Sequence, residues 1–249
     1  MSFTFFFKEK PIIIDAFTKY SNVYEYASIK EANNFIPEWW KNMNSLYEET
    51  NQYGIKTKKS TIKRCDGFIE NYKNGFMIPA WSDFSILATD ANWSYQFSDG
   101  ISSIVSHPNK QFSDIFEDYL HFKIISPWMI REKTGIKFAF TNPIWNNVDK
   151  SQILIFPQGI VEYKYQHATN INIFIKKTPI QNEFTFGTPL AHIIPLSEKQ
   201  VKIRNHLISD EEYRQLDDLH VNITFLNKYR KIINTKGSST ACPFNHPKY

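Results

Sequence analysis

Residues 61–90 read TIKRCDGFIENYKNGFMIPAWSDFSILATD, with the pair Asn74-Gly75 between two apolar stretches. An Asn-Gly pair in this setting is a strong hairpin signal, because both central residues of a type I′ turn need a positive φ. The sequence therefore predicts a hairpin in which residues 62–70 pair with residues 76–88. This prediction favours a mainly β fold.

Further short apolar stretches support the same fold class. They predict strands at residues 3–7, 12–17, 93–97, 120–125, 128–131, 136–141, 153–156, 159–165, 171–175 and 189–195. Many short strands separated by turn residues are typical of a sandwich or barrel and not of a βαβ sheet.

Helices are predicted at two places. Near the N-terminus, Ser28 with Glu31 at the capping-box position begins one short helix, and Pro37 begins another that carries Trp39-Trp40. That pair either forms an exposed binding surface or clamps the helix to the sheet. Near the C-terminus, residues 209–212 (Ser-Asp-Glu-Glu) provide a cap and an acidic first turn for helical structure over residues 210–231.

The chain is predicted to form a single β-rich domain over residues 1–249. Within it, residues 1–60 hold strands and short helices, 61–196 the β core, 197–234 a helical region and 235–249 a tail rich in Gly, Ser, Pro and Asn.

Composition excludes several classes of protein. Hydrophobic residues make up 42% and charged residues 22%, which is typical of globular proteins. The net charge of +4 comes from basic residues spread along the chain, so nucleic acid is not expected as a partner. No apolar stretch is long enough for a membrane span. The two cysteines, Cys65 and Cys242, fit free thiols in a reducing cytoplasm.

Familiar catalytic and metal motifs are absent from the sequence, including the phosphate-binding loop, GxGxxG and GxSxG. No histidine has an acid two residues later, so a metal site would need a dispersed set such as His121, His167 and His192, and none is expected. Asp83 lies in an otherwise apolar stretch. It either marks a ligand site or faces solvent from an alternating strand.

Residues 156–195, FPQGIVEYKYQHATNINIFIKKTPIQNEFTFGTPLAHIIP, carry a resemblance. The segments 159–165 (GIVEYKY) and 187–192 (GTPLAH) resemble, in order and separation, the third and fourth motifs of trimeric dUTPases. Residues 127–143, with Thr134-Gly135 before an apolar stretch, resemble the segment that leads into the second motif. The resemblance implies a dUTPase-like β-clip or barrel, with an N-terminal helix and a helical C-terminal region added.

The same resemblance implies roles for individual residues. Glu162 would take the place of the catalytic Asp, Tyr165 that of the Tyr beneath the deoxyribose, and His192 that of a Gln. The second motif would fall at residues 142–145, which offer neither hydroxyl nor arginine. Transition-state charge would therefore lack its usual stabilisation.

A second resemblance involves the phrases at residues 61–84, SPWMI, FPQGIVEY and GTPLAHIIPL. Together they resemble an uncharacterised family encoded by tailed phages and some bacteria, which implies a host cytoplasm or a virion as the setting.

Three functions follow as hypotheses. The first is a protein that binds a nucleotide or other small ligand without conventional dUTPase chemistry, at Glu162, Tyr165, His192 and Asp83, in a pocket that subunits of a homo-oligomer share. The second is a divergent nucleotide pyrophosphatase with Glu162 as base and Mg²⁺ as cofactor. The third is a phage structural or host-interaction protein with no small ligand.

Overall fold

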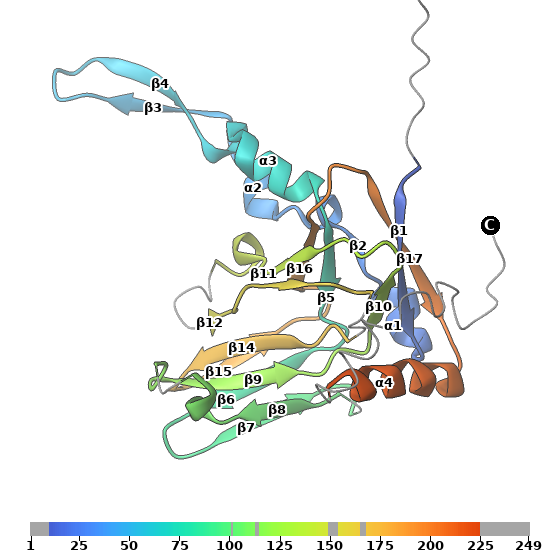
Figure 1. Cartoon of the computed structure of the whole chain (residues 1–249). Helices are drawn as coiled ribbons and strands as arrows, with labels where there is room; N and C mark the ends of the chain where they lie inside the picture. Colours follow the sequence, from blue (N-terminus) through green and yellow to red (C-terminus); the bar gives the residue numbers. More distant parts are fainter. Residues whose placement is uncertain (1–9, 101, 113–114, 149–153, 165–167, 225–249) are drawn as a thin grey trace, which may run out of the picture.

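The structure is a computed structural model that describes residues 10–100, 102–112, 115–148, 154–164 and 168–224, without the side chains of residues 109 and 218–224. It is mainly β (Figure 1). The described strands form five sheets, and none of these sheets closes into a barrel. The mainly β prediction is therefore confirmed, whereas the dUTPase-like fold remains a prediction.

The largest sheet has the order β13-β11-β16-β5-β2. Its strands are Gly159–Val161, Phe138–Thr141, Pro189–Pro195, Phe76–Pro79 and Lys30–Glu31. All four pairings in this sheet are antiparallel.

A four-stranded sheet has the order β12-β14-β9-β8, with strands Leu154–Ile155, Ile171–Lys176, Tyr119–Ile124 and Ile104–His107. A three-stranded sheet has the order β15-β6-β7, with strands Thr178–Phe184, Phe84–Ala88 and Trp93–Phe97.

The sheet β10-β1-β17 joins distant parts of the chain, with strands Met129–Glu132, Ile12–Thr18 and Val201–Leu207. Strand β1 is antiparallel to β10 but parallel to β17, with Ile12 opposite Val201 and Thr18 opposite Leu207.

The last sheet is a hairpin of β3 (Leu46–Thr50) and β4 (Lys56–Ser60). It extends away from the rest of the molecule (Figure 1), and every residue in both strands is exposed.

Helices are short except for the last. The α-helices are α1 (Ser21–Tyr26), α2 (Glu38–Asn42), α3 (Asp66–Lys73) and α4 (Asp210–Thr224). The 3-10 helices are η1 (Ala32–Phe35), η2 (Ile62–Arg64), η3 (Asn109–Phe112) and η4 (Ile144–Asn146). No helix of the described residues is long and apolar enough to cross a membrane.

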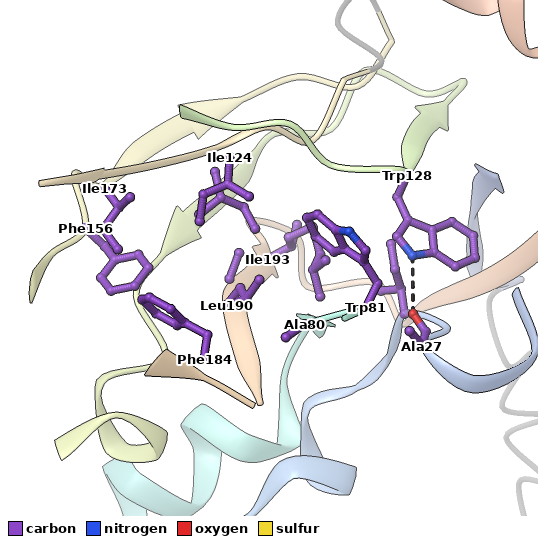
Figure 2. Packing of buried hydrophobic residues seen from close by; sticks show 14 of the residues in the cluster. Ala27, Ala80, Trp81, Ile124, Trp128, Phe156, Ile173, Phe184, Leu190 and Ile193 are labelled. Carbon is purple, nitrogen blue, oxygen red and sulfur yellow. Dashed lines mark hydrogen bonds between the residues drawn. The ribbon is translucent and has the colours of Figure 1, made fainter. Parts of the chain in front are cut away.

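One hydrophobic core joins four of the sheets, with buried side chains from β1, β5, β6, β9, β14 and β16. Figure 2 shows part of it, including Trp81 and Trp128. The indole Nε1 of Trp128 donates a hydrogen bond to the carbonyl oxygen of Ala27 over 3.3 Å. A buried indole needs such an acceptor, so this bond fixes the segment after α1 against β10.

The predicted hairpin at residues 62–88 is wrong in its first half, because residues 62–70 form η2 and most of α3. Phe68 and Tyr72, four residues apart, bury their side chains together against Met77. This helical spacing outweighs the strand-like composition. Gly75 does adopt a positive φ of 81°, at the end of the helix and not in a hairpin turn.

The helix predicted from Ser28 is also wrong in its first residues. Lys30 and Glu31 form β2, because they pair with Met77 and Phe76 of β5, and η1 follows. In contrast, the cap predicted at Ser209 is confirmed: Glu212 N donates to Ser209 Oγ, and Ser209 N donates to Glu212 Oε2. Residues 225–249 lie outside the described part of the chain.

Candidate functional site

His192 of β16 is a core residue and not part of an open site. Its side chain is 1% exposed, and its Nε2 donates to the carbonyl oxygen of Asn74 over 2.8 Å. Burial lowers the pKa of the imidazole. His192 therefore joins β16 to the end of α3 as a neutral side chain.

Glu162 lies immediately after β13, half-buried beside the turn at Gly135. Strand β11 separates it from His192: Val161 pairs with Phe138, whereas His192 pairs with Thr141 at the other end of that strand. The structure thus does not bring these two predicted site residues together. Tyr165 and His167 lie outside the described residues.

Asp83 is exposed, immediately before β6. Its Oδ1 accepts a hydrogen bond from the backbone N–H of Phe186 over 2.6 Å. Asp83 also lines a groove of about 290 Å³ with Gln96, Gln181 and Glu183. Its carboxylate fixes the turn that follows β15, which accounts for an acid in this apolar stretch.

A cleft of about 420 Å³ lies where β9 and β10 meet α1 and α4. Its lining includes two lysines, several hydroxyls and one exposed carboxylate, contributed by Lys19, Tyr20, Lys123, Ser126, Tyr213 and Asp217. We call it the Lys123 cleft. Its volume falls within the roughly 300–1,000 Å³ typical of small-molecule sites.

The backbone of β9 explains how Lys123 reaches this cleft. Side chains alternate between the two faces of a strand. Phe122 and Ile124 point into the hydrophobic core, so Lys123 lies on the outer face. It is half-buried, and no hydrogen bond or ion pair of its side chain occurs among the described residues.

Lys19, the second cation of the cleft, is paired. Its Nζ lies 2.8 Å from Asp210 Oδ1, and this hydrogen bond raises the pKa of the Lys19 ammonium. The same group lies 5.2 Å from the ring centre of Tyr20 and 5.6 Å from that of Tyr213. These contacts hold Lys19 at the edge of the cleft, beside the start of α4.

The polar wall of the cleft is held by a buried hydrogen-bond network. Thr169 Oγ1 lies 2.8 Å from Ser126 Oγ and 2.7 Å from the carbonyl oxygen of Trp128. Ser126 N donates to Asn170 Oδ1 over 3.3 Å. The network positions the residues 126–128 and 168–170 against each other, which gives the cleft a defined shape.

A smaller pocket of about 270 Å³ adjoins the cleft, because Ala168 and Asn170 line both. Its other lining residues include His121, Phe112, Phe140, Gln158, Tyr163 and Asn172. We call it the His121 pocket. Gly159, Val161 and Tyr163, which also line it, belong to the segment 159–165 that resembles a dUTPase motif.

His121 is 4% exposed, and its Nε2 lies 3.3 Å from Asn172 Oδ1. Its Nδ1 is buried without a hydrogen-bond partner. The ring stacks on His107 and Phe174, with ring centres 4.8 and 4.6 Å apart. Burial, and then the charges of His107 and Lys123, lower the pKa of His121, so its imidazole is neutral near pH 7.

Within the described residues, no group of three His, Cys, Asp or Glu side chains is placed to hold a metal ion.

The exposed Trp39 packs on Phe68 and Trp145, and Trp40 stacks on Phe68. The tryptophan pair thus packs α2 on α3, and Trp40 also packs on the apolar cluster that includes Met77 of β5.

Sequence reasoning did not identify Lys123 as a site residue. The signal was the alternation in residues 119–124, YLHFKI, where His121 and Lys123 alternate with apolar residues.

Comparisons with models of known protein families and with curated protein sequences give no match.

Proposed function

We propose that this protein binds a small molecule that carries an oxyanion, a phosphate or a carboxylate, in the Lys123 cleft. The observation that carries the proposal is Lys123 itself, a half-buried residue that lines the cleft and whose ammonium has no partner among the described residues. Partial burial of an unpaired cation is costly, and an anionic ligand would remove that cost.

The surroundings of Lys123 suit such a ligand. Hydroxyls of Tyr20, Ser103 and Ser126 lie in the same lining and can donate to anion oxygens. Trp81, which is 5% exposed, and the apolar residues Pro127 and Met129 also line the cleft, so a few directed polar groups stand beside apolar side chains. Asp217 is the one carboxylate in the described lining, and it is exposed.

The proposed function is binding of the anion without hydrolysis. A pyrophosphatase needs groups that hold Mg²⁺ between phosphates and a base near the attacking water. Glu162, the predicted base, does not line the Lys123 cleft, and no metal-binding group of side chains is present in the described parts of the chain.

The test is calorimetric titration of the full chain with inorganic phosphate and pyrophosphate, at low and high salt. We expect binding that Lys123→Gln weakens at least tenfold, because a half-buried charge contact is lost. Lys176→Gln is the matched control: Lys176 is exposed on β14 of the same sheet and does not line the cleft. Equal binding by both variants, or no binding by wild type, would refute the proposal.

A second candidate function is supported by the β3–β4 hairpin. An isolated two-stranded hairpin is marginally stable in water, yet this one is held at its base, where Lys63 Nζ donates to the carbonyl oxygens of Lys41 and Met43 over 2.6 and 2.9 Å. A fixed, exposed arm is suited to contact another macromolecule. Cross-linking from a Tyr53→Cys variant at its tip, in lysate of the cells that produce the protein, would test this candidate, and labelling at the tip with no cross-linked species would contradict it.

A further inference from the structure

We infer that the His121 pocket holds the uncharged nitrogen heterocycle of the same ligand, so that the ligand is a nucleotide or a close analogue. This inference rests on the proposed function, because it places the anionic part of the ligand in the Lys123 cleft.

The His121 pocket and the Lys123 cleft adjoin each other. His121 and Lys123 are two residues apart on β9 and therefore lie on one face of the sheet, about 7 Å apart along the strand. Ala168 and Asn170 line both spaces. The two spaces therefore adjoin, and this is the basis for placing one ligand across both.

The volume of the His121 pocket suits part of a ligand. At about 270 Å³ the His121 pocket is smaller than the roughly 300–1,000 Å³ of a complete small-molecule site, so it suits a fragment of a ligand. The Lys123 cleft provides the remaining volume.

One atom of His121, Nδ1, is buried without a hydrogen-bond partner. The carboxamide oxygen of Asn172 can only accept, so His121 Nε2 donates to it and Nδ1 is left as a bare acceptor. A buried polar atom without a partner destabilises the structure. Nδ1 has no contact with solvent in this structure, so a ligand N–H group would reach it only after the imidazole turns toward the pocket, and it would then supply the missing bond.

The lining of the His121 pocket is aromatic and uncharged. The pocket combines aromatic side chains, Phe112, Phe140 and Tyr163, with the amides of Gln158 and Asn172. The imidazole is neutral, and the described lining contains no charged side chain. Flat apolar surfaces with uncharged donors and acceptors fit a nucleobase, whereas a charged fragment would pay its desolvation without compensation.

The experiment compares three kinds of probe by calorimetry on the full chain: inorganic phosphate, the nucleosides adenosine and uridine, and the two nucleoside 5′-monophosphates. We expect at least one monophosphate to bind tenfold or more tightly than inorganic phosphate. His121→Phe should remove that advantage. His107→Phe should keep it, since His107 stacks on His121 but does not line the pocket.

The outcomes separate the two proposals. If phosphate binds through Lys123 but neither monophosphate binds more tightly, the ring assignment is wrong and the anion site stands. If wild type binds no probe, both fail. Should His121→Phe not fold, nitrogen NMR of the wild-type histidines provides the readout: Nδ1 of His121 should shift with the monophosphate and not with phosphate, and an unchanged signal would overturn the inference.

Discussion

Glu132 offers a quantitative test of how a buried carboxylate holds a turn. Its side chain is at the end of β10 and is 1% exposed. Oε1 accepts a hydrogen bond from the backbone N–H of Thr134, and Oε2 accepts from Gly135 and Ile136 over 2.6 and 3.2 Å. All three bonds are to a charged acceptor, for which about 1.5–3 kcal/mol each is typical.

Glu132→Gln keeps the shape of this side chain but replaces one oxygen with an NH₂ group. That group cannot accept, so at least one backbone N–H loses its bond and faces another donor. We expect a loss of about 3 kcal/mol in the free energy of unfolding, which is about 1–1.5 M in the urea midpoint for a slope of about 2–3 kcal/mol/M.

Urea denaturation followed by tryptophan fluorescence measures this change. Glu183→Gln is the matched control, because Glu183 is an exposed strand residue and its substitution should stay within about 0.5 kcal/mol of wild type. A Glu132→Gln protein as stable as the control would show that the carboxylate does not hold the turn.

Three further predictions follow from individual residues. Gly75→Ala should lower stability by more than about 2 kcal/mol in urea denaturation, because φ is 81° and a Cβ would lie 2.3 Å from the carbonyl oxygen of Ile193; a neutral effect would contradict this. Asp217→Asn should strengthen phosphate binding about two- to fivefold by calorimetry, since it removes an exposed negative charge worth about 0.5–1 kcal/mol from the cleft lining, and unchanged affinity would count against the anion site. Burial lowers the pKa of His192 in the folded chain. As pH falls below about 6.5, the unfolded chain therefore takes up a proton at this histidine more readily than the folded chain does, and protonation favours unfolding. The urea midpoint should therefore fall from pH 7 to pH 5, less steeply in His192→Gln, and an equal slope in both proteins would refute this.

Much of the sheet structure could be predicted from local sequence, and its arrangement could not. Stretches such as residues 171–175 and 189–195 form strands as predicted, because most of their side chains are apolar and buried. The helical region predicted over residues 197–234 is wrong at residues 201–207, which read VKIRNHL and form strand β17, because the place of this strand depends on pairing with β1. Such tertiary pairing leaves little local signal.

The candidate site was harder to predict than the fold. Motif reasoning selected Glu162 and His192, but the register of β11 separates them and His192 is buried. The cleft is built from residues distant in sequence, such as Lys19, Lys123 and Tyr213, which only the folded chain brings together. Free lysines on an outer sheet face cannot be distinguished from ordinary surface lysines until the neighbouring elements are placed.

The parallel pairing of β1 with β17 has a consequence for how the protein is made. Ribosomes synthesise the N-terminal strand early, but its parallel neighbour does not exist until residues 201–207 have been translated. Until then, one edge of β1 is open to pairing with other chains. We therefore expect nascent or truncated chains that end before residue 201 to depend on chaperones, and refolding of the full chain to be slow.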